Sequence, residues 1–378
     1  MASKRSTAFG RSSVIGMASR SLIAKRKILV VSHDIGGAQA IYPVVPKLRR
    51  NRNLHVDVIA GGFAQKVFAR LRRENTSEDW SDAKIDEYLD KNRPDLLLSS
   101  TSWKARLEQG FRNRARVRGI PSIVVIDFWS NYRMRWHDAT YRYEDGLDQV
   151  CVMDAQTAAA MQKEGYPIEK IHVTGQPHLE RCYQRAVGPP SNSGAISDLA
   201  ILFLTISLSA LGLNDDPVAP IQVVCEALGH LHKTAKQPVS LLIRPHPHET
   251  PTPDFLSRIQ QFATSGITVH LADRTRPILE QLKRCDVVLG YITMGLFEAR
   301  SLGKQAIAIK LADHPPELVA AMANAGIDLV PFEAGSIASS LSRPGNQLGT
   351  HKINTHVGAA DAIVRLCQDL VGGAVDAG

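Results

Sequence analysis

Short apolar runs and amphipathic stretches alternate along almost the whole chain. The apolar runs are rich in Val, Ile and Leu and end at Gly, Ser, Thr or Asp, as is typical of buried strands that lead into loops. In the first half the predicted strands are residues 27–32, 55–60, 94–100, 121–127, 149–154 and 171–175. The stretches between them predict helices over residues 38–50, 63–73, 82–92, 103–118 and 155–164.

The same alternation starts again in the second half. The predicted strands there are residues 199–205, 239–244, 268–271, 286–290, 306–309 and 328–330. The predicted helices are residues 217–234, 253–265, 278–284, 294–302 and 356–370. Strands and helices that alternate in this way predict an α/β fold of parallel sheets with helices on both faces.

The length of 378 residues is too great for one ordinary core and predicts two domains. Residues 188–197, GPPSNSGAIS, have the composition of a linker. We therefore expect a Rossmann-like N-terminal domain over residues 27–187 and a Rossmann-like C-terminal domain over residues 198–378. These two domains should face each other across a cleft that binds an anionic, nucleotide-like ligand.

Composition limits the class of protein. With 44% hydrophobic and 22% charged residues, the chain is typical of soluble globular proteins. Its five cysteines stand singly, which indicates neither a disulfide framework nor a zinc knuckle and favours a reducing cytoplasm. No apolar run reaches the ~18 residues that a membrane span requires.

The net charge of +8 is concentrated near the amino terminus. Residues 1–26 contain many basic side chains and no acidic ones, and we expect a disordered basic tail. Weak attraction to the anionic inner face of a membrane is the alternative. Few aromatic residues interleave with the basic clusters, so no nucleic-acid partner is expected.

The first candidate site follows the first strand, in the sequence Ser32-His33-Asp34-Ile35-Gly36-Gly37. Open parallel sheets bind ligands at the carboxyl ends of their strands. A Gly-Gly turn before a helix would expose backbone N–H groups to phosphate, and His33 or Asp34 could act on a substrate hydroxyl. A tight turn that needs a positive φ is the alternative explanation of Gly36 and Gly37.

The second candidate is Arg244-Pro245-His246-Pro247-His248-Glu249, directly after a predicted strand. Arg244 could bind phosphate oxygens bidentately, and His246 could donate a proton to a leaving phosphate. The prolines prevent the helical spacing of a zinc-protease motif. A polar loop without a function is the alternative.

The third candidate begins at Thr293, at the start of a predicted helix. Thr293 could cap this helix and bind phosphate together with the N–H groups of Met294 and Gly295. Glu298, one turn later, could reach ribose hydroxyls. A plain helix cap and a solvated carboxylate would explain the same residues.

The fourth candidate is an aromatic and basic loop after the strand at 121–127. Such side chains could stack on and hold an acidic or sugar-like acceptor, although a local hydrophobic lid is the alternative. The predicted acceptor-binding residues are Trp129, Asn131, Tyr132, Arg133 and Arg135. The adjacent pair Glu144 and Asp145 precedes Gly146 and could supply a base, or could be surface charge only.

Together these motifs resemble those of GT-B glycosyltransferases, with two Rossmann-like domains. The segment VTGQP at 173–177 looks like the TGxP exit from the first domain of that superfamily, and TMGLFEARSLGK from Thr293 is similar to its donor-site helix. Arg244-Pro245-His246-Pro247 resembles the His-Pro motif of capsule, sialic-acid, Kdo and teichoic-acid transferases. The HVEAGLR-type loop of non-hydrolysing UDP-GlcNAc 2-epimerases is absent, which disfavours that activity.

The resemblance implies a metal-independent glycosyltransferase, or a glycerophosphotransferase-like enzyme, of surface-polysaccharide synthesis. The C-terminal domain would bind a nucleotide-activated donor linked to CMP or CDP, and the N-terminal domain a glycan or lipid-linked acceptor. His246 would be catalytic or phosphate-binding, and Asp34, His33 or Asp145 would deprotonate the acceptor. No cofactor beyond the donor is expected, and the enzyme would be cytoplasmic or peripheral on the inner face of the membrane.

Two other functions fit the same residues. A sugar-nucleotide epimerase or hydrolase of this fold would turn over its substrate with no acceptor present. A non-catalytic homologue would bind nucleotides without turnover.

Overall fold

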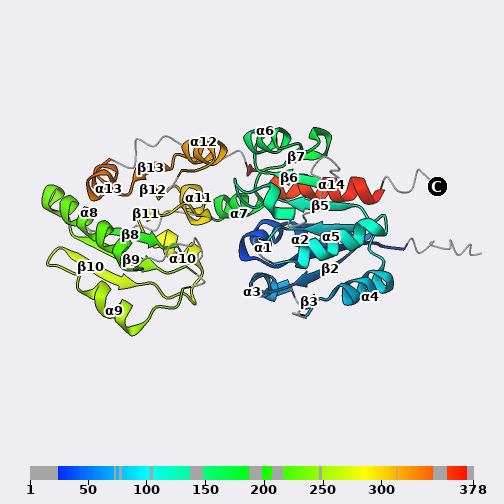
Figure 1. The fold of residues 1–378 in the computed structure, drawn as a ribbon, viewed down its shortest axis with the longest axis horizontal. Helices are drawn as coiled ribbons and strands as arrows, with labels where there is room; N and C mark the ends of the chain where they lie inside the picture. Colours follow the sequence, from blue (N-terminus) through cyan, green and yellow to red (C-terminus); the bar gives the residue numbers. More distant parts are fainter. Residues whose placement is uncertain are drawn as a thin grey trace, which may run out of the picture.

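The computed structural model describes residues 24–71, 74–75, 79–102, 105–136, 148–186, 198–206, 216–246, 249–311, 313–343 and 356–372. Within these residues the chain forms two α/β halves that lie side by side (Figure 1). The predicted linker and residues 1–23 of the predicted tail lie outside the described residues.

A seven-stranded parallel sheet forms the N-terminal half, in the order β3-β2-β1-β4-β5-β6-β7. Its strands are β1 (Arg26–Ser32), β2 (Leu54–Ala60), β3 (Glu74–Asn75), β4 (Leu96–Ser99), β5 (Ser122–Val125), β6 (Gln149–Val152) and β7 (Ile171–Val173). Its helices are α1 (Ile35–Ile41), α2 (Val44–Arg50), α3 (Ala64–Phe68), α4 (Asp82–Asn92), α5 (Leu107–Val117), α6 (Ala155–Lys163) and α7 (Pro177–Ala186). Short 3-10 turns are η1 (Ala69–Leu71), η2 (Arg133–Trp136) and η4 (Ile168–Lys170).

Successive side chains of β1 point to opposite faces of this sheet. Ile28 and Val30 pack into a core with α1, α2 and α3, while Leu29 and Val31 pack into a second core with α4 and α5. All four are at most 1% exposed. The continuous apolar run of β1 is therefore explained by helices on both faces.

The C-terminal half has a six-stranded parallel sheet in the order β10-β9-β8-β11-β12-β13. Its strands are β8 (Leu199–Leu204), β9 (Val239–Arg244), β10 (Ile267–Leu271), β11 (Val287–Gly290), β12 (Gln305–Lys310) and β13 (Asp328–Pro331). Its helices are α8 (Ala219–Ala235), α9 (Pro253–Gln260), α10 (Ile278–Arg284), α11 (Met294–Ser301), α12 (Pro316–Ala325) and α13 (Ala334–Leu341).

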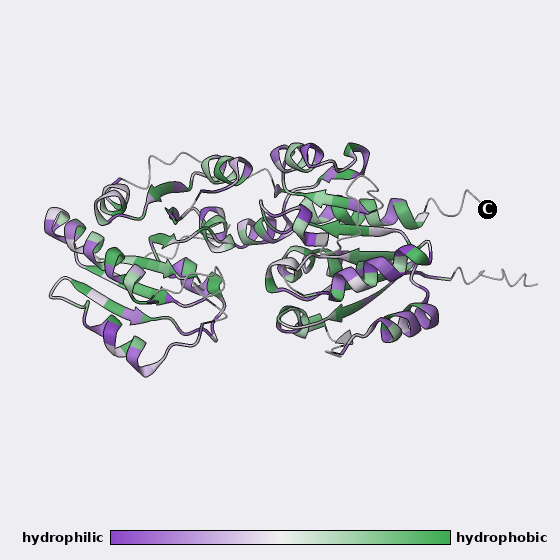
Figure 2. Cartoon of the chain, in the orientation of Figure 1, coloured by the Kyte–Doolittle hydropathy of each residue, from purple (hydrophilic) through white to green (hydrophobic). Residues whose placement is uncertain are grey.

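In both sheets the direction in which successive strands are added reverses at an internal position, between β1 and β4 in the first sheet and between β8 and β11 in the second. This is the doubly wound order in which ligands bind beside the reversal, at the carboxyl ends of the strands. The predicted fold class of two Rossmann-like α/β domains is confirmed. Figure 2 shows the strands mostly hydrophobic and the outward faces of the helices mostly hydrophilic.

One apolar core is shared by the two halves. It joins side chains of β5, β6 and α6 to those of β8, β11, α11 and α12. The ring of Trp129, after β5, stacks on Phe297 of α11 with 4.3 Å between centroids and 17° between planes. The halves are therefore in direct apolar contact at this point.

The last helix, α14 (Ala359–Gly372), departs from the division predicted from the sequence. Residues 198–378 were predicted to form the C-terminal domain, but Ile363 and Cys367 of α14 are buried in the core of the N-terminal half. Lys47 of α2 forms an ion pair of 2.7 Å with Asp361. Because an apolar helical face carries no information about which sheet covers it, the sequence pattern located the helix but not its partner.

The first predicted helix is also different in detail. The pattern predicted one helix over 38–50 after a glycine turn. In the structure α1 begins at Ile35, and the helix is interrupted at Pro43 before α2. Gly36 and Gly37 therefore lie in the first turn of α1, and neither has a positive φ. A Cβ on Gly37 would lie 2.5 Å from Cβ of Ser100, so close packing rather than turn geometry requires glycine here.

We expect Gly37→Ala to destabilise the protein by about 1–3 kcal/mol, because the added methyl would overlap the end of β4. Gly229→Ala in α8 is the matched control. No atom lies within 4 Å of a Cβ built there, so alanine should stabilise the helix by about 0.5–1 kcal/mol. Urea unfolding of both variants measures the difference, and equal effects at both positions would contradict this explanation.

Candidate functional site

The carboxyl ends of β8, β9 and β11 form one edge of the C-terminal sheet. Leu204, the last residue of β8, lies beside Arg244 of β9 on one side and Gly290 of β11 on the other. The loops that follow these strands contain Thr205, His246 and Thr293. The structure therefore brings the second and third predicted motifs to the same edge.

Arg244 is half-buried and is held by the loop before α10. Its Nη1 donates to Oε1 of Gln281 at 2.8 Å and to the carbonyl oxygens of Asp273 and Arg276 at 3.5 and 3.3 Å. Burial, followed by the charge of Arg274, lowers the pKa of Arg244, while Glu298 and Asp273 oppose this shift. The guanidinium is thus fixed in position at the strand end.

The backbone at His246 is tied to the adjacent strand. Its N–H donates to Oγ1 of Thr205 at 3.0 Å and to Oε2 of Glu249 at 2.7 Å, and Thr205 also donates to Glu249. The side chain of His246 is half-buried at this edge. Pro247 and His248 lie outside the described residues.

Thr293 is the N-cap of α11, in an extended conformation, but its side chain makes no capping hydrogen bond within the described chain. The first N–H groups of a helix have no partner in the helix itself, so those of Met294 and Gly295 suit an anion. A Cβ on Gly295 would lie 2.4 Å from Cδ1 of Leu204, so this glycine also has a packing reason.

Glu298 of α11 is not solvated. It is 3% exposed, and its Oε1 lies 2.6 Å from Nε2 of His178 on α7, across the junction of the two halves. Oε2 of Glu298 and Nδ1 of His178 are buried and have no hydrogen-bond partner within the described residues. The predicted solvated alternative for Glu298 is therefore wrong, and one carboxylate oxygen remains unused.

Two histidines at this junction have shifted pKa values of opposite sign. Burial alone would lower the pKa of His178, but Glu298 and the nearby Cys182 raise it to about 10. Burial lowers the pKa of His356 to about 4, with Asp154 opposing it, and the N–H of Gln176 donates to Nδ1 of His356 at 3.1 Å. His178 is therefore a buried cation at neutral pH, and His356 is neutral.

The carboxyl ends of β1, β2, β4 and β5 form the corresponding edge of the N-terminal sheet. Nδ1 of His33 lies 2.8 Å from Oδ1 of Asp34, and each side chain is about one-third exposed, at 32% and 35%. The His33 ring lies over Gly61 and Gly62, where a Cβ would come within 2.8 and 2.5 Å of the ring. These glycines make room for the ring.

Two cavities meet at this His33–Asp34 pair. His33 lines a cavity of about 730 Å³ together with residues of α4, α5 and the β2–α3 loop, among them Trp80, Gln109 and Asn113. Asp34 lines a smaller cavity of about 200 Å³ with Asp127 and Asn131. The pair therefore stands between two spaces that could hold ligand groups.

The loop after β5 is organised by Arg135, which forms an ion pair with Asp127. The guanidinium also donates to Oγ1 of Thr101 at 2.7 Å and to the carbonyl oxygens of Phe128 and Ser130. These bonds use the guanidinium of Arg135 to hold its own loop against Asp127 and Thr101. Arg135 also lines the smaller cavity beside Asp34, and its predicted role as an acceptor ligand stays a prediction.

Trp129 and Tyr132, also predicted to bind an acceptor, are 2% and 0% exposed. Trp129 stacks on Phe297 and donates from Nε1 to Asp154 at 2.5 Å, so its ring is packed into the junction of the two halves, which is neither exposed acceptor binding nor the predicted local lid. Asn131, with a φ of 58°, and Arg133 are the exposed members of the predicted set. Glu144 and Asp145 lie outside the described residues.

Four residues at these edges and at the junction had no role predicted from the sequence. Asp127 begins the aromatic and basic loop but was given no role of its own, although a strand-end carboxylate is itself a signal. Glu108, Gln176 and His178 are each at most 8% exposed and bind loop atoms or the other half of the chain. Gln176 lies in the VTGQP segment, which was noted only as a domain exit, and nothing in the sequence context of Glu108 and His178 distinguishes them from solvated helix residues.

Among the described residues no three His, Cys, Asp or Glu side chains are grouped so that they could hold a metal ion. Within the same part of the chain, no helix has the length and apolar character needed to cross a bilayer.

No protein-family model and no curated protein sequence matches the chain. Solved structures do match it. A UDP-GlcNAc 2-epimerase from Neisseria meningitidis bound to UDP-GlcNAc is 16% identical, with a TM-score of 0.67 over 91% of this chain and 100% of that chain. A UDP-GlcNAc 2-epimerase from Methanocaldococcus jannaschii is 15% identical, with a TM-score of 0.68 over 90% and 99%. MurG from Acinetobacter baumannii is 12% identical, with a TM-score of 0.57 over 91% and 99%.

These similarities extend over nearly the whole of each chain, so the GT-B architecture of two Rossmann-like domains is confirmed. At 12–16% identity these similarities show the fold alone. The narrower resemblance to His-Pro capsule and teichoic-acid transferases stays a prediction.

The two histidines at the junction predict how stability depends on pH. His178, whose pKa is raised, stabilises the fold fully below about pH 6.5 and loses this contribution as the pH rises toward 10. His356, whose pKa is lowered, stabilises fully above about pH 6.5 and loses its contribution as the pH falls toward 4. Unfolding free energies of wild type and each variant, measured from pH 4 to 10, should show that His178→Gln flattens the alkaline limb only and His356→Gln the acid limb only.

Removal of one partner of the buried pair should cost more than removal of both. His178→Ala leaves the Glu298 carboxylate buried without a cation, and we expect a loss of about 3–5 kcal/mol. The double variant His178→Leu with Glu298→Gln should lose much less than the sum of the single variants His178→Leu and Glu298→Gln. Additive losses in this double-mutant cycle would contradict a coupled pair.

Proposed function

We propose that the protein is an enzyme that acts on a nucleotide-activated sugar, with the nucleotide on the C-terminal half and the sugar facing His33 and Asp34. The support is geometric. Both polar strand-end edges lie at the reversal points where doubly wound sheets bind ligands. The likeness in fold to an enzyme bound to UDP-GlcNAc favours UDP over the CMP or CDP expected from the His-Pro motif.

The nucleotide would be held by charge and by helix geometry. The fixed guanidinium of Arg244, the His246 loop and the start of α11 at Thr293, Met294 and Gly295 would bind the diphosphate. The unused Oε2 of Glu298 is a buried acceptor of the kind that a ribose hydroxyl satisfies. Close packing against Asp127 and Ser100 requires glycine at positions 36 and 37, and their role in binding phosphate stays a prediction.

We favour a reaction that needs no separate acceptor, of the epimerase or hydrolase type. The observation that carries this choice is the burial of Trp129 and Tyr132, because the loop expected to hold an acceptor is packed into the junction instead. His33 and Asp34 would exchange a proton with the sugar or with water, and basic groups would neutralise the leaving diphosphate.

Glycosyl transfer is the second candidate, and one observation favours it. The cavity of about 730 Å³ beside His33 is large enough for a second ligand and is lined by polar and charged side chains, such as Asp82 and Arg106, as well as aromatic and apolar ones. An acceptor hydroxyl in this cavity would lie next to the His33 imidazole. Metal independence, and peripheral contact of the basic tail with a membrane, stay predictions for either reaction.

Ligand binding tests the nucleotide site first. UDP or UDP-GlcNAc at a hundred times its dissociation constant should stabilise the native state by about 2.7 kcal/mol. A thermal-shift series with UDP, UDP-GlcNAc, CMP and CDP should therefore give its largest shift with the uridine ligands, and Arg244→Ala should abolish it. Arg258→Ala, which removes an exposed ion pair with Asp216 in the same half, is the control and should leave the shift intact.

Turnover separates the two reactions. With UDP-GlcNAc alone, proton and carbon NMR should reveal an epimer or free sugar with UDP if no acceptor is needed. We expect Asp34→Asn and His33→Gln each to lower kcat by about 10²–10⁴. Absence of turnover until an acceptor sugar is added would instead establish transfer, and turnover that is unchanged in both variants would exclude the pair from the chemistry.

A further inference from the structure

Glu108 is a buried carboxylate that the proposed chemistry does not use. It lies in the first turn of α5, is 1% exposed, and its Oε1 accepts three hydrogen bonds. The donors are the backbone N–H of His33 at 2.8 Å, Oγ of Ser100 at 3.0 Å and Oγ of Ser102 at 2.6 Å. One oxygen atom therefore binds the ends of both β1 and β4.

The network also reaches Asp34. The backbone N–H of Asp34 donates to Oγ of Ser102 at 3.3 Å, and Ser102 in turn donates to Glu108. Ser32 is linked to the same group through a bond of 2.7 Å between its Oγ and that of Ser100. Three successive residues at the end of β1 are thus connected to Glu108, directly or through one hydroxyl.

Burying the carboxylate of Glu108 costs free energy, so it is a poor way to stabilise a loop. Glu108 forms no ion pair within the described residues, and its Oε2 is buried without a hydrogen-bond partner. An unpaired buried carboxylate is costly, and an apolar side chain would fill the same space without that cost. The network is therefore better explained by the position that it imposes on the loop than by stability.

The loop that this network fixes contains His33 and Asp34, the pair that stands between the two cavities. His33 faces the larger cavity and Asp34 the smaller one, so a shift of this loop backbone would change both. Glu108 and Ser102 accept hydrogen bonds from backbone N–H groups of the loop. They therefore fix the loop without competing for the reactive side-chain atoms. We infer that Glu108 is a positioning residue, which holds His33 and Asp34 in register with the ligand. This inference rests on the proposed function of that pair.

Hydrogen exchange tests the positioning itself and needs no substrate. In Glu108→Ala the N–H of His33 loses its acceptor, and exchange of a peptide spanning residues 31–38 should become about tenfold faster. Glu108→Gln keeps an accepting oxygen at the same place and should change it by less than about threefold. Should Glu108→Ala fail to fold, Ser102→Ala removes the acceptor of the Asp34 N–H and should speed exchange of the same peptide.

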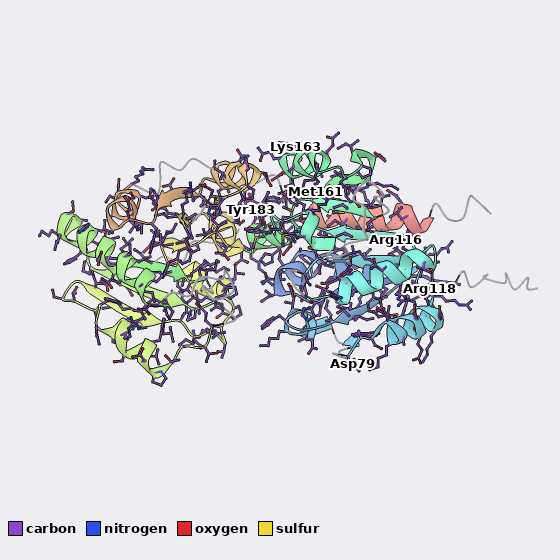
Figure 3. All side chains as sticks on the ribbon, in the orientation of Figure 1. Asp79, Arg116, Arg118, Met161, Lys163 and Tyr183 are labelled. Carbon is purple, nitrogen blue, oxygen red and sulfur yellow. The ribbon has the colours of Figure 1, made fainter. Side chains whose placement is uncertain are left out.

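Arg118→Ala is the matched control on the same helix. Arg118 lies just beyond the other end of α5, away from the C-terminal half (Figure 3), and pairs with Asp86 and Asp90 of α4. It should leave exchange of residues 31–38 unchanged. Unchanged exchange in both Glu108→Ala and Ser102→Ala would overturn the inference.

Turnover then connects the position to function. With UDP-GlcNAc as substrate, we expect Glu108→Ala to lower kcat by about 10², because small displacements of reacting groups cost this much, with KM within about twofold. Glu108→Gln should recover most of kcat, which a role as a charged catalytic group would not allow. Loss of protection with unchanged turnover would leave the backbone role intact and show that the proposed function of His33 and Asp34 is wrong.

Discussion

Two adjacent residues of α11 determine how the halves of this protein face each other. Phe297 stacks on Trp129, and Glu298 forms a buried ion pair with His178, so consecutive positions bind two different segments of the N-terminal half. The same helix starts one turn earlier, at the edge of the C-terminal sheet where we propose that the nucleotide binds. Any change at this junction therefore also moves the N-terminus of α11, and the geometry of the ligand site depends on the contact between the halves.

Buried polar groups are concentrated at the ends of the strands and at this junction. Glu108 and Arg112 of α5 both bind the loop after β4, and Arg112 also donates to the carbonyl oxygen of Arg135. Arg135 in turn holds Asp127, which lies against Gly36 at the start of α1. Groups of this kind are costly to bury unless they are satisfied, so their presence at one edge indicates loops held for function and not only for stability.

The sequence pattern predicted what depends on local hydrophobicity. The helix at residues 82–92 and nearly all strands lie within a few residues of their predicted bounds, because both faces of a parallel strand are buried and its apolar run is conspicuous. The features that were not predicted depend on packing between elements that are distant in the sequence. The pattern missed α7, α12 and α13 and placed α14 with the wrong half. It also predicted that Trp129 binds a ligand, since side-chain chemistry alone does not distinguish a ring that binds a sugar from one that packs on Phe297.

The end of the chain returns to the N-terminal half and is bound there by α7. Glu180 of α7 accepts from the N–H groups of Gly358 and Ala360 at the start of α14, at 2.8 and 3.0 Å. His356 accepts from Gln176 just beside the Glu298–His178 pair. With the chain crossing here and an apolar core shared, a rotation of one half has to break contacts of α7 or α11. Under the proposed function, a ribose that contacts Glu298 would compete with His178 for that carboxylate or use its remaining oxygen, which would couple nucleotide affinity to the orientation of the halves through one side chain.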